Sequence, residues 1–241
     1  MRLPFICNSC MFGQEKLETP PYPSYVELRN DGRYEFICSQ GHKTITILQQ
    51  QKFEVLYEIG AYALIDGYYR ESIASFTSAL ERFYEFFLLV KSLQNKIDTH
   101  IFNSAWKLIS SQSERQLGAF IFSYTEQFSK QPTLLSQNNI AFRNSVIHKG
   151  TIPTKNEALD YGQAILNVVT PLLRETLAAF PDGVQQSIFK HLQECRGEEG
   201  GFPISTMSMP TILSIDQTGS ALEIKNLETE LDNLKWWRQR W

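Results

Sequence analysis

Residues 73–88 read IASFTSALERFYEFFL, and this stretch decides the fold class. Its stripe-forming side chains recur every three or four residues, at Ile73, Phe76, Thr77, Leu80, Phe83, Tyr84, Phe87 and Leu88. This spacing places them along one side of an α-helix. Since such stripes mark the core-facing sides of helices, the sequence predicts a mainly helical fold.

Further helices are predicted on either side of this stretch. The same periodicity indicates helices at about 53–64, 98–111, 114–128, 133–148 and 184–195. A longer helix is expected to begin at Thr154, because Thr154 and Glu157 have the spacing of a capping box. Pro171 lies inside this helix and is expected to kink it.

Residues 1–48 have a different pattern, which predicts β structure. Apolar and polar residues alternate at 26–28 and at 34–36, and the Asn-Asp-Gly sequence at 30–32 favours a hairpin turn between the two runs. A third strand is expected at 44–48. The predicted organisation is a small β domain (1–48), a helical bundle (49–196), a linker (197–220) and a C-terminal helix (221–241).

The composition fits one folded core with a small appendage. Of the 241 residues, 42% are hydrophobic, and the net charge of −3 gives no general attraction for nucleic acid. No run of about 18 apolar residues predicts a membrane span, and Cys7 follows the first residue too closely for a signal peptide. We therefore expect a cytoplasmic protein with no membrane partner, whose cysteines are thiols or metal ligands.

Two short knuckles, Cys7-x2-Cys10 and Cys38-x3-His42, predict a metal site. Zinc takes four thiolate or imidazole ligands in a tetrahedron, and the hairpin between the knuckles is expected to bring them together. Gly41 allows the second knuckle to turn tightly. The spacing resembles that of zinc ribbons, and with all four positions filled it predicts a structural Zn²⁺. The segment carries equal numbers of acidic and basic residues, which favours a structural or partner-binding role over tight nucleic-acid binding.

The helix predicted at 133–148 ends with the pattern R-N-x3-H, formed by Arg143, Asn144 and His148. Asn144 and His148 are four residues apart and face the same way on a helix, and the long Arg143 side chain reaches over the same cleft. A histidine can take the proton of an RNA 2′-hydroxyl or give one to the leaving 5′-oxygen. An arginine stabilises the charge that gathers on the phosphate, and Asn144 can orient the imidazole or hold a phosphate oxygen.

The surroundings of this pattern are poor in acidic residues. None occurs between Glu126 and Glu157, whereas four basic residues lie in this window, namely Lys130, Arg143, Lys149 and Lys155. This placement predicts a locally positive cleft suited to a phosphate. The alternatives are an ordinary solvated face, and a helix end at which Arg143 and His148 bond backbone carbonyls.

With these residues in view, the helical part resembles the HEPN superfamily over about residues 53–180. Residues 60–73 leading into 77–81 are similar to the family's paired first helices, and residues 142–150 are similar to its R-x4-6-H catalytic helix. The resemblance implies an up-and-down bundle of four to five helices. It also implies a homodimer in which two Arg–His motifs meet in one cleft.

The same resemblance assigns roles to individual residues. Arg143, Asn144 and His148 match the catalytic positions, and Glu81 matches a polar position that faces the cleft. The activity implied is RNA cleavage that needs no cofactor and leaves a cyclic phosphate. Such proteins commonly act as toxins or phage-defence effectors, often on transfer RNA.

Two functions therefore stay open. The first is an endoribonuclease with RNA as its substrate. The second is a non-catalytic dimeric adaptor that binds a protein partner or inhibitor through the zinc ribbon or the tail 221–241. In that tail a leucine stripe (Leu222, Leu227, Leu231, Leu234) favours packing on its own bundle, and Trp236, Trp237 and Trp241 are expected to be covered by the bundle, a second subunit or a partner. A DNA-binding regulator is disfavoured, because neither a helix-turn-helix pattern nor a strongly basic stripe occurs.

Overall fold

A computed structural model of the chain describes residues 1–12, 23–197, 202–215 and 223–240. These residues contain nine helices and five strands, so the predicted fold class, mainly helical with a small N-terminal β region, is confirmed. The chain divides into two compact units. The β unit comprises residues 1–51 and 188–210, and the helical unit comprises residues 52–187 and 211–241.

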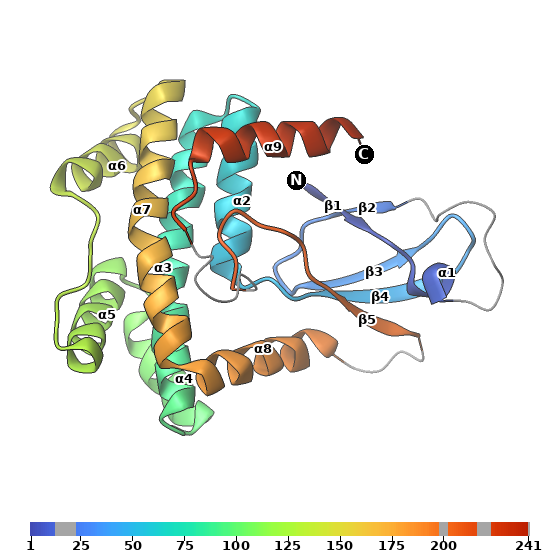
Figure 1. Cartoon of the computed structure of the whole chain (residues 1–241), viewed down its shortest axis with the longest axis horizontal. Coiled ribbons are helices and arrows are strands. Elements are labelled where there is room, and N and C mark those ends of the chain that lie inside the picture. Colours follow the sequence, from blue (N-terminus) through green and yellow to red (C-terminus); the bar gives the residue numbers. More distant parts are fainter. Residues whose placement is uncertain (13–22, 198–201, 216–222, 241) are drawn as a thin grey trace. The chain divides into compact units, whose positions relative to one another are not determined.

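The helical unit is built around one long helix, α3, which contacts α2, α5, α6 and α7 (Figure 1). Its helices are α2 (Lys52–Ile65), α3 (Tyr69–Gln94), α4 (Thr99–Ile109), α5 (Ser113–Phe128), α6 (Gln137–Lys149), α7 (Lys155–Ala179) and α9 (Leu227–Arg240), and α8 (Pro181–Arg196) begins in this unit. Every predicted helix is present, with ends that differ by a few residues. Among the helices described, none is both long and apolar enough to cross a membrane.

The predicted stripe of α3 forms the core of this unit. Phe83 and Phe87 are fully buried, and Phe120 of α5 meets Phe87 edge-on with ring centroids 5.1 Å apart. Tyr84 stacks on Phe120 at 4.5 Å. Burying each such ring contributes roughly 1.5–3 kcal/mol, which explains why this sequence stretch dominates the fold.

Helix α7 begins with the capping box that the sequence predicts. The Glu157 backbone N–H donates to the Thr154 hydroxyl at 3.3 Å, and the Thr154 backbone N–H donates to the Glu157 carboxylate at 2.7 Å. The helix continues through Pro171 to Ala179 as one element. It thereby spans the length of the core and places Tyr161, near its first turns, close to α3 and α6.

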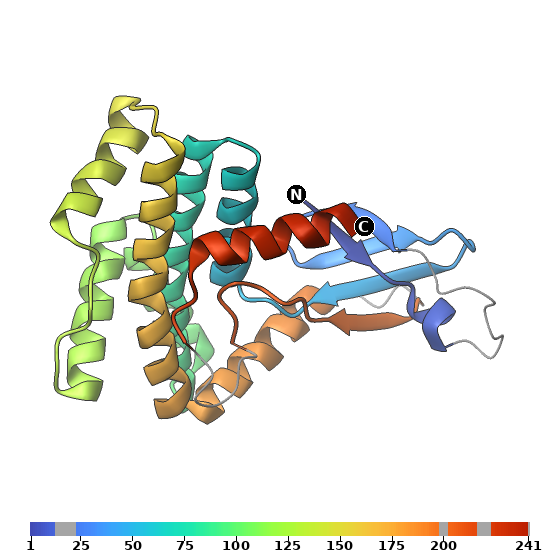
Figure 2. The ribbon, with the colours of Figure 1, turned by 45° about the horizontal axis from the view of Figure 1, so that its top comes forward.

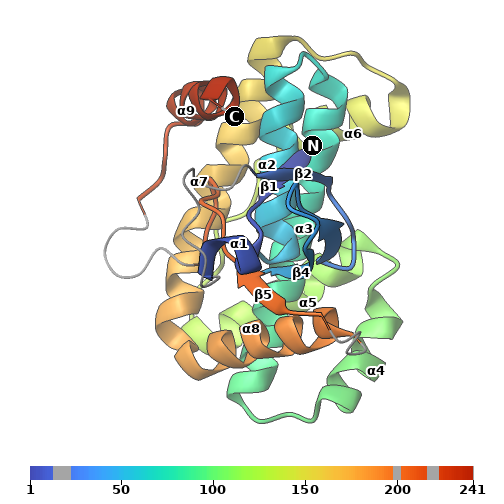
Figure 3. The ribbon, with the colours of Figure 1, turned by 90° about the vertical axis from the view of Figure 1, so that its right-hand side faces the viewer.

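The C-terminal helix α9 lies against α2 and α7 (Figure 3). Leu227 and Leu231 are buried, so the described part of the leucine stripe packs on its own bundle. Trp236 and Trp237 pack edge-on at 5.1 Å and remain 46% and 47% exposed, so the bundle alone does not cover them. Leu222 and Trp241 lie outside the described residues.

The β unit contains two small sheets. In the first, β1 (Arg2–Phe5) pairs antiparallel with β2 (Ser24–Glu27). In the second, β4 (Lys43–Leu48) lies between β3 (Arg33–Ile37), which is antiparallel to it, and β5 (Ile204–Met207), which is parallel (Figure 2). A short helix, α1 (Asn8–Phe12), follows β1.

The hairpin predicted between 26–28 and 34–36 is wrong. Strand β2 pairs with β1, and β3 pairs with β4, although the chain does turn at 30–32 between β2 and β3. The physical reason is the N-terminal strand, whose Leu3 and Phe5 are buried and supply β2 with a better-covered partner. This strand has only four residues and contains a proline, so its alternation is too short to recognise in the sequence.

The stretch predicted to be a linker, 197–220, holds two structured segments. Residues 204–207 form β5, and residues 211–215 are all buried in the helical unit. The strand was missed because β5 is short and half polar. The helical unit therefore includes a chain segment that the sequence assigned to neither predicted domain.

Candidate functional site

The first knuckle of the predicted metal site follows β1. Cys7 lies just beyond this strand, and Cys10 lies on the short helix α1. The Met11 backbone N–H donates to the Cys7 carbonyl at 3.1 Å, which closes the first turn around the two thiols. Pairing of β1 with β2 fixes where this turn begins.

The second knuckle is the turn that joins β3 and β4. The Cys38 backbone N–H donates to the His42 carbonyl at 3.0 Å, and the Gly41 N–H donates to the Cys38 carbonyl at 2.9 Å. Gly41 has a φ of 79°, which confirms its predicted role, because side-chain-bearing residues rarely adopt this conformation. We predicted that a hairpin between 26–28 and 34–36 would bring the two knuckles together. The turn between β3 and β4 forms the second knuckle instead.

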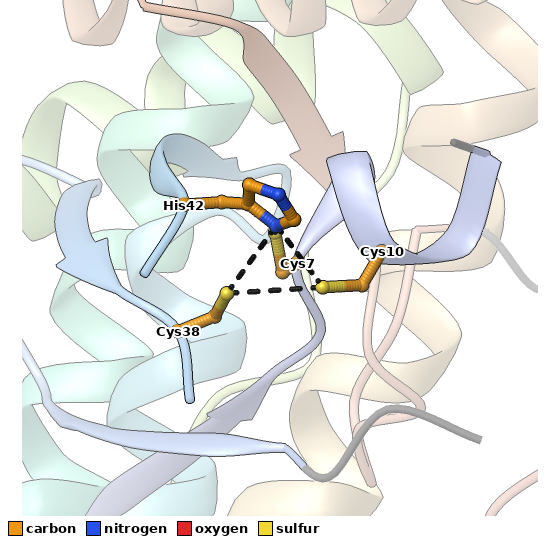
Figure 4. Close-up of side chains that lie close together, drawn as sticks. All are labelled: Cys7, Cys10, Cys38 and His42. Atoms are coloured by element: carbon orange, nitrogen blue, oxygen red, sulfur yellow. Dashed lines mark hydrogen bonds between the residues drawn. The ribbon is translucent and has the colours of Figure 1, made fainter. Parts of the chain in front are cut away.

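The four predicted ligands converge on one point (Figure 4). Their Sγ and Nδ1 atoms all lie within 4.8 Å of one another. The His42 Nδ1 atom lies 3.3 Å from the Cys10 Sγ and 3.7 Å from the Cys38 Sγ, and the two sulfurs are 3.7 Å apart. Three buried sulfurs around one imidazole nitrogen form a candidate site for a single metal ion.

The electrostatics of the cluster favour a bound cation. Burial, together with the neighbouring thiols of Cys38 and Cys7, raises the pKa of Cys10 to about 12. Burial also acts to raise the pKa of Cys38, but hydrogen bonds from the backbone N–H groups of Gln40 and His42 and from the thiols of Cys10 and Cys7 together outweigh it and bring the pKa to about 7. Several thiolates cannot be held this close without a positive charge between them, and a metal ion supplies that charge.

The second predicted site lies on α6. The Ser136 hydroxyl caps this helix by accepting from the Asn139 backbone N–H at 3.3 Å, and Gly150 ends it. Val146 is fully buried and anchors the helix. Because Asn144 and His148 are separated by four residues of a formed helix, they share one face, as predicted.

Arg143 is half-buried and held by side chains. Its Nη1 atom donates to the Asn144 Oδ1 atom at 2.9 Å. The positive charge of Arg143 also acts on Tyr161, Glu81 and Tyr84. The printed sequence also allowed an arrangement in which backbone carbonyls accept hydrogen bonds from Arg143. In the structure Arg143 donates to a side chain instead.

Glu81 of α3 lies close enough to Arg143 for the two charges to interact. Burial raises the pKa of its carboxyl group, while the positive charges of Arg143 and Arg82 act in the opposite direction. Sequence reasoning missed two further polar residues, Thr77 and Tyr161, whose hydroxyl oxygens are 2.9 Å apart. Thr77 was assigned to the core stripe and Tyr161 was not singled out, so no local signal marked either as part of a site.

His148 lies on the last turn of α6 and is exposed, together with Lys149. Within the described part of the chain, its imidazole has no hydrogen-bond partner, so a ligand can reach it. The positive charge of the region is smaller than predicted, because Lys130 forms an ion pair with Glu175 over 2.6 Å. Arg143 and Lys149 remain as the basic groups closest in sequence to His148.

Comparison of the chain with protein-family models, with curated proteins and with solved structures found no match. The function of the two sites is therefore inferred from their residues and geometry.

Proposed function

We propose that the helical unit is an endoribonuclease of HEPN type that cleaves RNA without a catalytic metal. This proposal rests on the hydrogen bonding and exposure of the R-N-x3-H residues on α6. Arg143 donates to Asn144, its charge acts on Glu81, and His148 is exposed one turn further along the helix. An arginine held by a neighbouring side chain and an exposed histidine on the same helix suit acid–base cleavage of a phosphodiester.

In the proposed reaction, the RNA 2′-oxygen attacks the adjacent phosphorus and forms the P–O2′ bond while the P–O5′ bond breaks. His148 takes the proton of the 2′-hydroxyl or supplies the proton that the 5′-oxygen gains. The products are a 2′,3′-cyclic phosphate and a 5′-hydroxyl. Arg143 stabilises the negative charge on the phosphate oxygens, and no oxidant or second substrate is required.

A homodimer would supply a second histidine for the other proton transfer. In this proposal two α6 helices share one cleft, and one His148 acts as the base while the other acts as the acid. RNA, including transfer RNA in a toxin or defence role, is the proposed substrate class. This arrangement predicts that cleavage falls steeply when the protein is diluted below its dimerisation range.

The test is cleavage of total cellular RNA by the purified full-length chain in the presence of a magnesium chelator. His148→Ala is expected to abolish cleavage, and His100→Ala is the matched control. His100 is an exposed histidine on α4 whose backbone N–H, and not its ring, bonds the Asp98 cap. Sequencing and end-labelling of the products should reveal cyclic phosphate ends. Equal activity of the two variants, or activity that needs Mg²⁺, would refute the proposal.

A second candidate function, a non-catalytic adaptor, is favoured by one observation. The described surface exposes apolar side chains on two helices of the helical unit, with Ile101 and Leu108 of α4 63% and 72% exposed and Trp237 of α9 47% exposed. Exposed apolar groups of this size are typical of interaction surfaces. Absence of RNA cleavage, combined with loss of a co-purifying protein in Trp237→Ala, would favour this function.

We also propose that the metal of the Cys3His cluster is a structural Zn²⁺. A tetrahedral zinc with bonds of about 2.3 Å to sulfur and about 2.0 Å to nitrogen has S–S edges of about 3.8 Å and S–N edges of about 3.5 Å. The corresponding distances are 3.7 Å from Cys10 to Cys38 and 3.3–3.9 Å from the cysteines to His42. All four positions are protein ligands, which suits a structural role and leaves no open position for catalysis.

A further inference from the structure

One peptide group in the helical unit lies between two side chains of opposite charge. It belongs to residues 211–215, which are all buried and which we call the strap. The Ile212 backbone N–H donates to the Glu58 carboxylate of α2 at 3.2 Å, and the Lys225 ammonium group donates to the Thr211 carbonyl at 3.3 Å. This N–H and this carbonyl are the two ends of a single peptide group. The strap therefore places one peptide between the glutamate and the lysine.

The strap is held at two further points. Lys225 also donates to the Ile212 carbonyl at 2.9 Å, and the Ile215 N–H donates to the Glu54 carboxylate at 2.9 Å. The side chains of Ile212, Leu213 and Ile215 are buried, although the strap is neither helix nor strand. A short irregular segment that is held by a few side chains can open while the rest of a unit stays folded.

The charge of Glu58 is costly in this position. The N–H end of a peptide is positive and its carbonyl end is negative, so the strap peptide suits an ionised Glu58 on one side and Lys225 on the other. Burial outweighs this arrangement, because a carboxylate that is 3% exposed loses its hydration. As a result the pKa of Glu58 is raised to about 7, although the Ile212 N–H and the charge of Lys225 act to lower it.

Other ionisable groups face Glu58 from α2, from α9 and from Lys225. The negative charge of Glu230 on α9 adds to the rise in the pKa of Glu58. Burial lowers the pKa of Lys225, while the charges of Glu230 and Glu58 act to raise it. On α2, burial raises the pKa of both Tyr57 and Tyr62, which keeps these hydroxyls neutral near pH 7, and Glu54 is one turn away. The response of the strap to pH is therefore set by Glu58 and tuned by Lys225 and Glu230.

We propose that the strap is a proton-controlled latch, which is docked while Glu58 is protonated and opens more readily once Glu58 is ionised. When the strap opens, Glu58 gains water and can contact Lys225 directly, because the intervening peptide has left. Docking is strongest below pH 4.5, weakens as the pH rises toward 7 and levels off above 7, since the open state has the ordinary pKa of 4.5. This inference is independent of the proposed ribonuclease function.

Hydrogen exchange of the Ile212 and Ile215 amides in the full-length chain tests the latch. The reference is the amide of Phe83, which lies in the core of α3. At each pH the strap amides should exchange through an opening of lower free energy than the Phe83 amide. After correction for the intrinsic rate, their opening constant should rise on the order of a hundredfold between pH 5 and pH 8. Strap amides as protected as Phe83 at every pH would overturn the proposal.

Three variants separate a latch from a merely weakened contact. Glu58→Gln keeps an acceptor without a charge, so the opening constant should no longer depend on pH. Lys225→Met should move the pH at which the rise levels off upward, because it removes the charge that lowers the pKa of Glu58, and Glu230→Gln should move it downward. A structural loosening alone would increase opening at all pH values without moving this point.

Glu71→Gln is the matched control, because Glu71 is an exposed glutamate on α3, and it should leave the exchange of the strap unchanged. If Glu58→Gln does not fold, the opposite shifts in Lys225→Met and Glu230→Gln still decide the question. A pH response that persists in Glu58→Gln, or shifts of the same sign in the other two variants, would show that Glu58 does not control the strap.

Discussion

The Ile215 backbone N–H donates to the Glu54 carboxylate over 2.9 Å, in the interior of the helical unit. One turn further along α2, Glu58 accepts from the Ile212 N–H at 3.2 Å. Both glutamates are buried, at 0% and 3% exposure. On the opposite edge of the segment, Lys225 donates to the Ile212 carbonyl at 2.9 Å. The backbone of 211–215 is therefore held by side chains where no strand or helix supplies partners.

Replacing Glu54 tests how much its hydrogen bond with the Ile215 N–H stabilises the fold. Glu54→Ala leaves the Ile215 N–H buried without this acceptor and removes packed atoms, so we expect a loss of about 2–4 kcal/mol in the free energy of unfolding. Glu54→Gln keeps an acceptor and should lose less. The control is Glu71→Ala, an exposed glutamate on α3, which should change stability by less than about 0.5 kcal/mol. Urea unfolding measures all three, and similar values for Glu54→Ala and Glu71→Ala would contradict the assigned contact.

Glu58 should make the stability of the protein depend on pH. Burial raises its pKa to about 7, although the Ile212 N–H and the charge of Lys225 act in the opposite direction and Glu230 adds to the rise. The folded state therefore holds a proton that the unfolded state has released above its ordinary pKa of 4.5. Stability falls as pH rises from 4.5 to 7 and levels off above 7, with a loss of about 3 kcal/mol.

Urea unfolding of the wild type and of Glu58→Gln at a series of pH values checks this expectation. The variant carries no titrating group at this position and should lack the decrease between pH 4.5 and 7. A wild-type curve parallel to that of Glu58→Gln would show that Glu58 does not carry a raised pKa.

Much of the fold could be predicted because its signals are local. The stripe at 73–88, the Thr154–Glu157 cap and the end of α6 before Gly150 depend on residues a few positions apart, and all are present in the structure. Strand pairing is not local. The partner of β2 is β1 and that of β4 includes β5, more than 150 residues away, so neither pairing could be recognised from alternation.

The two candidate sites also differ in whether residues close together in the sequence indicate them. The metal ligands were predictable because cysteine and histidine pairs separated by two or three residues are typical of metal sites. The residue types and their spacing therefore indicate the site without further information. The charge of Arg143 acts on Tyr161 and Glu81, which lie on two other helices, and an ordinary tyrosine in a helix has no sequence signal that separates core packing from a place near a site. The buried Glu54 and Glu58 were missed for a similar reason, since glutamates in a helix are usually exposed.

Replacing one of the four ligands should abolish metal binding. The purified chain is expected to contain one bound metal ion, and Cys38→Ser should lose it, because three remaining ligands hold a structural ion weakly. Cys195→Ser is the matched control, since Cys195 is a buried thiol outside the cluster. Elemental analysis gives the stoichiometry, and replacement by Co²⁺ should give the visible absorption of a tetrahedral thiolate site. Full metal content in Cys38→Ser would exclude this cluster as the site.

Gly162 of α7 lies at a close contact with side chains of two other helices. A Cβ atom added there would lie 2.6 Å from side-chain atoms of both Phe76 on α3 and Leu227 on α9, so alanine cannot fit unless these side chains shift. We expect Gly162→Ala to cost about 1–3 kcal/mol from overpacking, which exceeds the gain of up to about 1 kcal/mol in helix propensity. Gly118→Ala is the control, because Gly118 lies on α5 with nothing within 4 Å of its added Cβ, and it should raise stability by roughly 0.5–1 kcal/mol. Thermal and urea unfolding of the two variants should therefore shift in opposite directions, and a stabilised Gly162→Ala would show that α7 does not approach Phe76 this closely.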